Sequence, residues 1–373
     1  MKFYCEKQVL LAAITTAARA SAGKSPIPAL EGLLFETDGF GVRITGYDLK
    51  KGIYTSIEAQ VENEGKILLT ARLISEIVRS MPDGIVTVSA NQDFMTKISC
   101  GNAEFDIMGS DPADYPELPK IEYESGISIE QSVLRNMLSE TLFAVSDSES
   151  RPIYTGALFD VDKNELTIVA VDGFRLALRR ETITDSDKEE NSFVVPGIAL
   201  SELEKICSDT PEMVRITVGA KHISFTTGET VLVSRRIEGE FLDYKKTIPS
   251  EFPVNLTVSR SQLQRAVDRV SLIIDERAKN PLRCVFGEDL IKINCLTPLG
   301  KADDVVIAEG DGKGLEMGFN SRYLKDSLRA APSEELKLSI INNVSPFIIT
   351  PEAEEESGKF LYMILPIRLK AED

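Results

Sequence analysis

The sequence predicts an α+β protein of three tandem repeats, each of which contributes two helices and two groups of antiparallel strands. Two recurring patterns carry this prediction. One is an amphipathic helix followed by paired strands, and the other is a short strand followed by a helix that stops before a proline. Each pattern occurs three times in the 373 residues, at a spacing of about 125 residues. The chain is too long for one ordinary core, and with 43% hydrophobic residues it can fill two or three.

The first pattern begins with three helices, which we expect at Lys7–Ala20, Glu130–Val145 and Arg260–Ile273. Their apolar residues recur at spacings of three and four, so they share one helical face. In chain order, this face consists of Val9, Leu10, Ala13, Ile14 and Ala17; of Leu134, Met137, Leu138 and Leu142; and of Leu263, Val267, Val270 and Ile274.

Each of these helices leads through a polar loop to two candidate strands. The turns that connect the paired strands contain Asp38–Gly41, Asp162–Asn164 and Gly287–Asp289, whose residue types favour tight turns. The expected pairs are Gly32–Glu36 with Val42–Thr45, Gly156–Val161 with Glu165–Ala170, and Leu282–Phe286 with Leu290–Cys295.

The second pattern places a short strand before each remaining helix. The strands are expected at Lys66–Leu69, Ser192–Val195 and Leu315–Phe319, and the helices at Ala71–Met81, Ala199–Ser208 and Arg322–Ala331. A proline soon after each helix (Pro82, Pro211 and Pro332) is a typical terminator. Because proline-containing linkers follow Tyr115 and Tyr244, we expect domains at residues 1–120, 121–250 and 251–373.

Composition and termini restrict where the protein acts. No apolar run reaches the roughly 18 residues of a membrane span, and Met1–Phe3 do not begin a signal peptide. We therefore expect a soluble, cytoplasmic protein with no membrane partner. Five scattered cysteines without a Cys-x-x-Cys pair are expected to be free and buried.

The sequence contains no recognisable catalytic or metal-binding motif. His222 is the only histidine and is expected at an exposed strand position, and Gly310–Gly314 is expected to be a turn between strands. Asp303–Asp304 and Asp185–Asp187 lie in polar stretches, where solvated surface is the simpler interpretation. We expect no cofactor, no metal and no catalytic residue, and hence a structural or binding protein.

The net charge of −17 argues against nucleic acid unless the cations are gathered in one place. Basic residues do recur on the polar sides of the helices, including Arg135 and the spaced set Arg322, Lys325 and Arg329. On any single helix, a solvated face explains such charge. If six equivalent helices line one surface, however, their cations would contact phosphates without distinguishing bases.

Four segments resemble one known family: Tyr362–Leu369, Val169–Ala177, Gly239–Tyr244 and Met1–Phe3. They are similar to the bacterial DNA polymerase III β subunits, the β sliding clamps, and the resemblance extends over essentially the whole chain. It implies three tandem DNA-clamp-like domains, each with two helices plus two antiparallel sheets, that form half of a closed ring. It also implies a non-enzymatic processivity factor of DNA replication, which acts as a homodimer around double-stranded DNA. The implied partners are a clamp loader, the replicative polymerase and other proteins that carry a clamp-binding motif.

The resemblance also implies site residues. An apolar groove would take hydrophobic anchors of a peptide, with Arg175 available for polar or carboxylate contacts. The peptide-binding positions are Tyr154, Val171, Gly173, Arg175, Leu176, Lys246, Thr247, Val344, Met363, Ile364, Leu365, Pro366, Ile367 and Arg368. The DNA-binding positions are Lys24, Arg72, Arg79, Arg151, Lys205, Arg265, Arg269, Arg322, Lys325 and Arg329. In the dimer, Phe105 and Ile107 of one copy would meet Leu272 and Ile273 of the other.

The chain departs from the family at positions that bear on peptide preference. Phe174 stands where many members have histidine, Leu242 replaces a usual proline, and Lys246–Thr247 replace Arg-Val. Two other functions stay open from the sequence. The repeats could form a scaffold that recruits partners without DNA, or an enzyme such as a nuclease or transferase could hide its site. An enzyme would gather acids with perturbed titration in one cleft.

Overall fold

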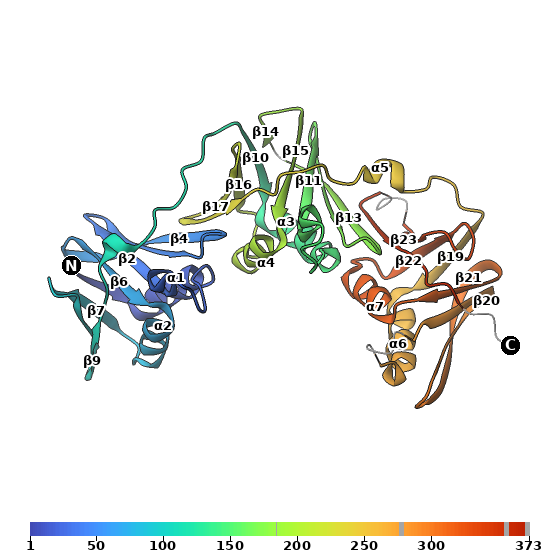
Figure 1. Ribbon diagram of the computed structural model, residues 1–373, viewed down its shortest axis with the longest axis horizontal. Helices are drawn as coiled ribbons and strands as arrows, with labels where there is room; N and C mark the ends of the chain where they lie inside the picture. The colour runs from blue at the N-terminus through green and yellow to red at the C-terminus, as the bar shows by residue number, and fades with distance from the viewer. Residues whose placement is uncertain (184, 276–279, 354–357, 370–373) are drawn as a thin grey trace. The chain divides into compact units, whose positions relative to one another are not determined.

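The computed structural model describes residues 1–183, 185–275, 280–353 and 358–369 (Figure 1). Within these ranges the strands form three antiparallel sheets, and six α-helices are nine or more residues long. The chain divides into two compact units. The first contains residues 1–134, 185–188 and 201–236, and the second contains 135–183, 189–200 and the described residues from 237 onward.

The first unit holds two sheets. The smaller has the order β5–β1–β7–β8–β9. Its strands are β1 (Lys2–Glu6), β5 (Gln60–Asn63), β7 (Ile85–Ala90), β8 (Met95–Cys100) and β9 (Ala103–Met108). The larger has the order β14–β10–β16–β17–β18–β4–β3–β2–β6. Its strands are β2 (Gly32–Asp38), β3 (Gly41–Tyr47), β4 (Lys51–Glu58), β6 (Gly65–Thr70), β10 (Ser125–Glu130), β14 (Asp185–Ser186), β16 (Met213–Val218), β17 (His222–Thr227) and β18 (Thr230–Arg235).

The nine-stranded sheet is shared by two repeats. The first repeat contributes β2, β3, β4 and β6, the second contributes β10, β14, β16, β17 and β18, and the two groups join where β18 pairs with β4. The hydroxyl groups of Thr55 and Thr230 lie 2.9 Å apart across this junction. Strand β4, the outermost of the first repeat's strands in this sheet, therefore has its second neighbour in the next repeat.

Helices α1 (Lys7–Ala18) and α2 (Ala71–Ser80) pack against the strands of the first repeat. Of the apolar face predicted for α1, Leu10, Ala13, Ile14 and Ala17 are buried with Phe3 in one core. The placement of Val9 on this face was wrong, because its side chain is exposed. The buried residues follow the spacing i, i+3, i+4, i+7, which places position 9 beside the face.

The second unit is built on one sheet with the order β15–β11–β12–β13–β24–β23–β22–β19–β21–β20. It too joins two repeats, because β13 pairs with β24 in a register that sets Leu176 opposite Met363. Its strands are β11 (Gly156–Asp162), β12 (Glu165–Val171), β13 (Arg175–Thr182), β15 (Glu190–Pro196), β19 (Val254–Ser259), β20 (Leu282–Thr297), β21 (Gly300–Phe319), β22 (Glu335–Ile340), β23 (Phe347–Pro351) and β24 (Phe360–Ile364).

Two predicted helices are shorter than expected. Each ends where a hydroxyl side chain donates to the carbonyl four residues earlier, Thr141 to Met137 and Ser271 to Val267, and a 3-10 turn follows. The remaining α-helices are α3 (Gln131–Ser139), α4 (Gly197–Ile206), α5 (Tyr244–Thr247), α6 (Arg260–Val270) and α7 (Ser321–Ala330). The 3-10 turns are η1 (Pro28–Glu31), η2 (Pro112–Asp114), η3 (Leu142–Ala144), η4 (Pro152–Thr155) and η5 (Ser271–Ile273). All five cysteines are free and buried, as predicted.

The third strand pair differs from its prediction. The expected turn at Gly287–Asp289 lies inside the continuous strand β20, and the hairpin turn comes after Thr297 instead (Figure 1). The glycine-rich segment 310–314, also expected to be a turn, lies within β21, where the register shifts. At Gly312 a Cβ atom would come within 2.4 Å of the Phe286 carbonyl oxygen, so only glycine permits this approach.

Candidate functional site

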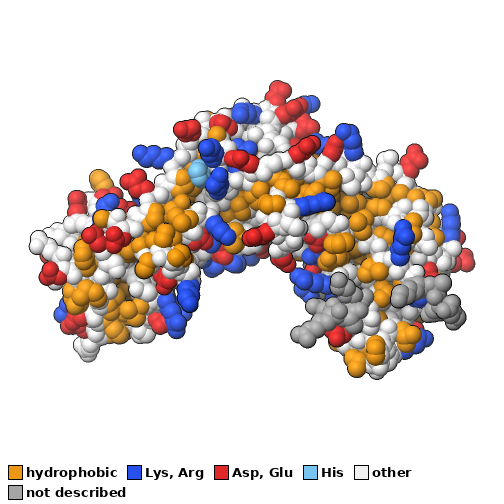
Figure 2. Space-filling view, viewed as in Figure 1, with side chains coloured by type: hydrophobic (Ala, Val, Ile, Leu, Met, Phe, Trp, Pro, Cys, Tyr) orange, Lys and Arg blue, Asp and Glu red, His pale blue; other side chains and the backbone are white. Residues whose placement is uncertain are grey.

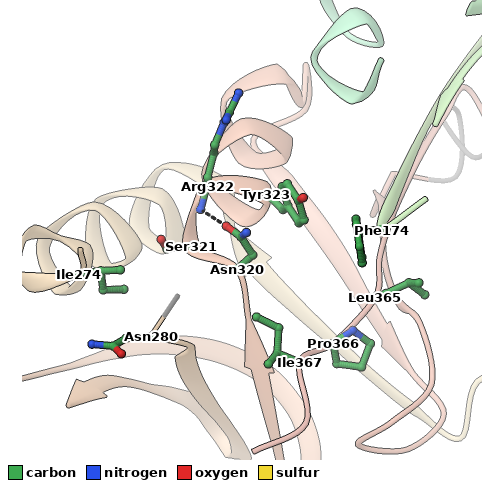
Figure 3. A pocket seen from close by; sticks show the side chains of 10 residues that line it. All are labelled: Phe174, Ile274, Asn280, Asn320, Ser321, Arg322, Tyr323, Leu365, Pro366 and Ile367. Atoms are coloured by element: carbon green, nitrogen blue, oxygen red, sulfur yellow. Dashed lines mark hydrogen bonds between the residues drawn. The ribbon is translucent and has the colours of Figure 1, made fainter. Parts of the chain in front are cut away.

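A cavity of about 540 Å³ lies in the second unit, and we call it the groove (Figure 3). Its size is typical of pockets that bury most of a small ligand, which span about 300 to 1,000 Å³. The turn between β12 and β13, the start of α7 and the segment after β24 supply most of its wall. The lining residues are Phe174, Ile274, Asn280, Asn320, Ser321, Arg322, Tyr323, Leu365, Pro366 and Ile367.

Backbone hydrogen bonds hold the segment after β24 in place on two sides. The amide of Leu365 donates to the carbonyl of Phe174 (2.8 Å), and the amide of Ile367 donates to that of Gly318 (2.8 Å). Pro366, between them, has no amide hydrogen to satisfy. The side chains of Leu365 and Ile367 remain partly exposed, so this segment presents apolar surface from a fixed backbone.

The turn that carries Phe174 is equally well fixed. Its backbone N–H and that of Arg175 both donate to the Asp172 carboxylate, at 2.9 and 3.0 Å. Gly173 has a φ of +94°, a conformation that a side chain would strain. The Phe174 ring is 60% exposed and stacks on Tyr323 with a centroid distance of 6.3 Å.

Arg175 lies beneath this wall with only 5% of its side chain exposed. It donates to Asp172 (3.0 Å), to Asp326 of α7 (2.7 Å) and to the carbonyl of Phe143 (2.5 Å). Its guanidinium also lies 4.5 Å from the Tyr323 ring centroid. The prediction that Arg175 is available for a partner's carboxylate is therefore wrong, because its charge is already neutralised inside the protein. Arg175 instead fixes Tyr323 and the start of α7 against the β12–β13 turn.

The other predicted peptide-site residues fall into three groups. Leu365, Pro366 and Ile367 line the groove. A neighbouring apolar cluster contains Val171, Leu176 and Met363, with Tyr154 packed against it, and Ile364 is fully buried. Exposed or partly exposed positions outside the lining are Gly173 in the turn, Lys246 and Thr247 on α5, Val344, and Arg368.

Sequence reasoning missed seven of the ten residues that line the groove. The residues that it did not assign to this site are Phe174, Ile274, Asn280, Asn320, Ser321, Arg322 and Tyr323. Asn320 carries a local signal, because an asparagine before a predicted helix is a typical cap, and its side chain accepts from the Arg322 amide (3.0 Å). Tyr323 carries none: it is one more residue on the surface of a helix.

Five of the predicted DNA-binding cations are already paired with carboxylates. Arg269 meets Asp304 at 2.7 Å and is the tightest of them. Arg72 meets Glu76 at 3.0 Å, Lys205 meets Glu202 at 3.0 Å, Lys325 meets Asp268 at 3.6 Å, and Arg322 meets Asp326 at 3.8 Å. A phosphate would have to compete with these acids for the cations.

The other five are exposed, and in the described ranges none of them forms an ion pair. They are Lys24 after α1, Arg79 at the end of α2, Arg151 before η4, Arg265 on α6 and Arg329 on α7. Helices α6 and α7 pack against each other, and Lys325 and Asp268 connect them. Arg265 and Arg329 therefore lie on one helical pair, with their charges open to an anion.

The residues predicted for the dimer interface occupy two different elements. Phe105 and Ile107 lie on β9, which in the described part of the chain pairs only with β8 and so has a free edge. Leu272 is largely exposed and Ile273 partly exposed in η5, directly after α6. An unpaired strand edge is a template for pairing with another chain.

The acidic stretches that were interpreted as solvated surface, and not as metal sites, form ion pairs with nearby cations. Asp303 pairs with Lys301 and Asp304 with Arg269, whereas Asp185 and Asp187 both pair with Arg215. Among the described residues, no three metal-ligating side chains form a cluster.

His222 is half-buried in an interior strand, β17, which corrects the expected exposed position. Burial and the nearby Arg235 and Lys221 lower its pKa, and Figure 2 shows it in pale blue beside basic side chains. It therefore stays neutral near pH 7.

In the described chain, no helix combines the length and apolarity needed to cross a bilayer.

Three family models match the chain in order. They describe the N-terminal domain of the DNA polymerase III beta subunit over residues 1–119, its central domain over 128–243 and its C-terminal domain over 245–368. Proteins named beta sliding clamp are similar over the whole length. Those of Staphylococcus aureus and Staphylococcus epidermidis are 30% and 31% identical to the chain, with 99% of each chain covered.

Solved structures agree in fold. A putative DNA polymerase III beta subunit from Eubacterium rectale has a TM-score of 0.93 at 30% identity and covers 98% of this chain and 99% of its own. The sliding clamp from Bacillus subtilis has a TM-score of 0.93 at 31% identity, with 99% and 100% covered. A sliding clamp from Pseudomonas aeruginosa bound to griselimycin has a TM-score of 0.93 at 26% identity, with the same coverage.

Proposed function

The chain belongs to the DNA polymerase III beta subunit family, and we propose from this premise that two copies close a ring around duplex DNA and recruit partners through the groove. The protein is a DNA sliding clamp, a processivity factor of replication and not an enzyme. Its three domains comprise residues 1–120, 121–250 and 251–373, and two copies contribute six.

The groove is the observation that carries the proposal for recruitment. Its wall is mainly apolar, it opens beside the apolar cluster of Val171, Leu176 and Met363, and its backbone is held by hydrogen bonds at both Leu365 and Ile367. A preformed apolar trough suits a short peptide whose hydrophobic side chains act as anchors. The peptide site comprises the lining residues together with the fourteen positions named from the resemblance, with Arg175 in a supporting role.

The cations on the helices supply the contacts with DNA. Lys24, Arg79, Arg151, Arg265 and Arg329 bind phosphate directly, because no acid in the described structure competes for them. The five paired cations contribute only after exchanging a carboxylate for a phosphate. Such binding is independent of sequence and weakens as salt rises. The excess acid on the rest of the protein discourages adhesion to DNA outside the ring.

Two copies associate head to tail. Phe105 and Ile107 on the free edge of β9 in one copy pack against Leu272 and Ile273 of η5 in the other. Because the two surfaces differ, the same contact forms twice about a two-fold axis and closes the ring. A closed ring needs a clamp loader to open it. The ring and its loader act in the cytoplasm. Their partners there are the replicative polymerase and other proteins that carry a clamp-binding motif.

Loading on a circular plasmid tests the topological claim. Labelled protein is loaded onto nicked circles with a clamp loader and ATP, separated from free protein by gel filtration, and the DNA is then cut once. We expect the label to stay on circles and to leave linear DNA. Cut DNA whose two ends carry bulky streptavidin blocks is the control and should keep the label.

Two outcomes would contradict the proposal. Equal retention before and after cutting would mean that the protein binds the surface of DNA and does not encircle it. A protein that never associates with the circles, in the presence of an active loader, would favour a scaffold that recruits partners without DNA.

A further inference from the structure

We infer that one end of the nine-stranded sheet is a docking surface for a short acidic peptide segment of a partner protein. We call this surface the cationic end, and it consists of five basic residues and one exposed leucine: Leu49, Lys50, Lys221, His222, Arg235 and Arg236. The cationic end lies in the first unit, whereas the groove lies in the second. The inference therefore stands apart from the proposed recruitment through the groove.

Strand pairing brings the basic residues together. Lys51 lies opposite Ser234 where β4 meets β18. Arg235, the next residue of β18, lies opposite His222 of β17. Lys50, which precedes Lys51, thus falls in the same row of the sheet as Arg235 and His222. Because neighbouring strands lie about 4.8 Å apart, the backbones of these three basic residues lie within about 10 Å of one another.

The row beyond this one is also basic. The backbone amide of Arg236 donates to the carbonyl of Lys221 (2.9 Å), so these two residues lie opposite each other at the ends of β18 and β17. The guanidinium of Arg236 donates to the carbonyls of Gly219 and Ala220, at 2.8 and 3.4 Å. These hydrogen bonds hold the charge of Arg236 at the β16–β17 turn, beside Lys221.

Three cations of this surface have their charges open to an anion. In the described part of the chain, no ion pair is formed by Lys50, Lys221 or Arg235, and all three are exposed. The nearest acid in the β3–β4 turn is Asp48, which is already bound. Its carboxylate accepts from the backbone amides of Lys50 and Lys51, at 2.9 and 2.8 Å, and from Lys51 Nζ at 2.6 Å.

His222 lies within this positive field. Burial, Arg235 and Lys221 all lower its pKa. Figure 2 shows the ring in pale blue beside basic side chains. Like charges that lie opposite each other across two strands repel. An anion that covers several of them relieves this repulsion, and it is therefore attracted more strongly than by one isolated cation.

Leu49 adds an apolar contact to the same surface. It is 50% exposed, and its φ of +70° lies in the left-handed region, where leucine is uncommon. The hydrogen bonds from the Lys50 and Lys51 amides to Asp48 hold the turn in this conformation. Backbone strain of this kind is concentrated at functional sites. A strained turn that presents an apolar side chain to solvent therefore favours a binding role.

The surroundings restrict the occupant to a short segment. The linker between the first two repeats passes this end of the sheet, since the amide of Glu124 donates to the carbonyl of Val218 (2.9 Å). A Cβ atom on Gly219 would also lie 2.5 Å from the carbonyl oxygen of Glu122. Both glutamates are exposed, so they would repel a duplex or another long polyanion. A few carboxylates beside one apolar side chain would instead meet only the cations and Leu49.

The test uses His222 as a built-in reporter, because it is the only histidine and gives one ring signal in NMR. Full-length protein labelled with carbon-13 at the histidine ε1 position is titrated at low salt with the blocked peptide Glu-Glu-Glu-Leu-Glu-Glu-Glu. We expect this peptide to shift the signal with a Kd below about 1 mM. It should also raise the pKa of His222, because bound carboxylates favour the charged imidazole. The matched peptide with glutamine in place of glutamate should leave the signal unchanged.

Two variants test the residues of the surface. Arg235→Glu should weaken binding of the acidic peptide by about tenfold. Its control is Lys66→Glu, which makes the same change of charge on β6, at the far edge of the same sheet, and should bind as the native protein does. Leu49→Gly should raise the unfolding midpoint, because glycine adopts the turn without strain, and should nevertheless weaken binding about threefold. A purely structural role of Leu49 would not give these opposite effects.

The inference is wrong if the acidic and glutamine peptides bind equally, or if Arg235→Glu or Leu49→Gly binds the acidic peptide as tightly as the native protein. Unfolding midpoints no lower than that of the native protein show that the variants are folded. A short DNA duplex that shifts the His222 signal at a lower concentration than the acidic peptide would assign this surface to nucleic acid, and would equally contradict the inference. None of these outcomes bears on the groove.

Discussion

Loss of the Arg175 side chain should destabilise the second unit. It is buried and donates to two carboxylates, Asp172 and Asp326, and to the Phe143 carbonyl. Replacing it with methionine preserves much of its volume and removes the charge. Asp172 then loses its cation and Asp326 keeps only its 3.8 Å pair with Arg322, although the two carboxylates keep 13% and 20% of their side-chain surface exposed.

Removing one partner of a buried ion pair costs about 3 to 5 kcal/mol, because the remaining charge is left uncompensated. The residual exposure of both carboxylates places Arg175→Met near the lower end, about 3 kcal/mol. Adding Asp326→Asn removes one of the two carboxylates that Arg175 had bound and should recover about 1 kcal/mol. Arg180→Met on the same strand is the matched control, since its pair with Glu165 is largely exposed and worth at most about 1 kcal/mol.

Urea unfolding is followed by hydrogen exchange of the amides in β13 and α7, so that the second unit is observed by itself. With an m-value of roughly 2 kcal/mol/M, Arg175→Met should lower the midpoint by more than 1 M, and Arg180→Met by less than 0.5 M. A shift of equal size in the two variants would refute the assignment of Arg175 as the buried charge that holds α7 against the turn.

Three other predictions each depend on one structural feature: the proposed dimer contact, the close approach at Gly312, and the hydrogen bonds to Glu334. Replacing Leu272 and Ile273 with alanine should give monomers in analytical ultracentrifugation, and an unchanged dimer mass would refute that interface. Gly312→Ala should destabilise the chain by about 1 to 3 kcal/mol in urea, because the added Cβ meets the Phe286 backbone. Hydrogen bonds from Ser261 and Ser259 lower the pKa of Glu334 to about 2 from 4.5, so its carboxylate contributes stability above pH 4.5 that is lost as pH falls towards 2. The difference in Tm between native protein and Glu334→Gln should therefore be largest near neutral pH and shrink in acid; a constant difference would contradict this.

Local periodicity was sufficient for the helices and for most strand pairs. It failed at β20, because a Gly-Glu-Asp sequence is as compatible with an irregularity inside a strand as with a turn. Only the partner strand decides between the two, and β21 carries the glycines that let the ladder continue past Glu288. The pairings of β18 with β4 and of β13 with β24 join segments that are far apart in the sequence, so no local sequence pattern could predict them.

At the groove, the sequence located apolar positions better than it assigned roles. The family resemblance implied Leu365 and Ile367, which do line the groove, but it also placed Arg175 at the disposal of a ligand. The reason is physical: Asp326 lies 151 residues away in sequence, and only the fold reveals that its carboxylate neutralises Arg175. Tyr323 was missed because its importance comes from its neighbours Phe174 and Arg175 and not from its position on α7.

The sharing of one sheet by two repeats has a consequence for any shortened version of the chain. A fragment that stops between repeats would keep every helix it encodes but would leave β4 or β13 without its neighbour, β18 or β24. The bared row of amides and carbonyls would then be free to capture strands from other molecules, which is how soluble proteins begin to aggregate. Since the second repeat contributes strands to both of the large sheets, a cut on either side of it breaks one of them.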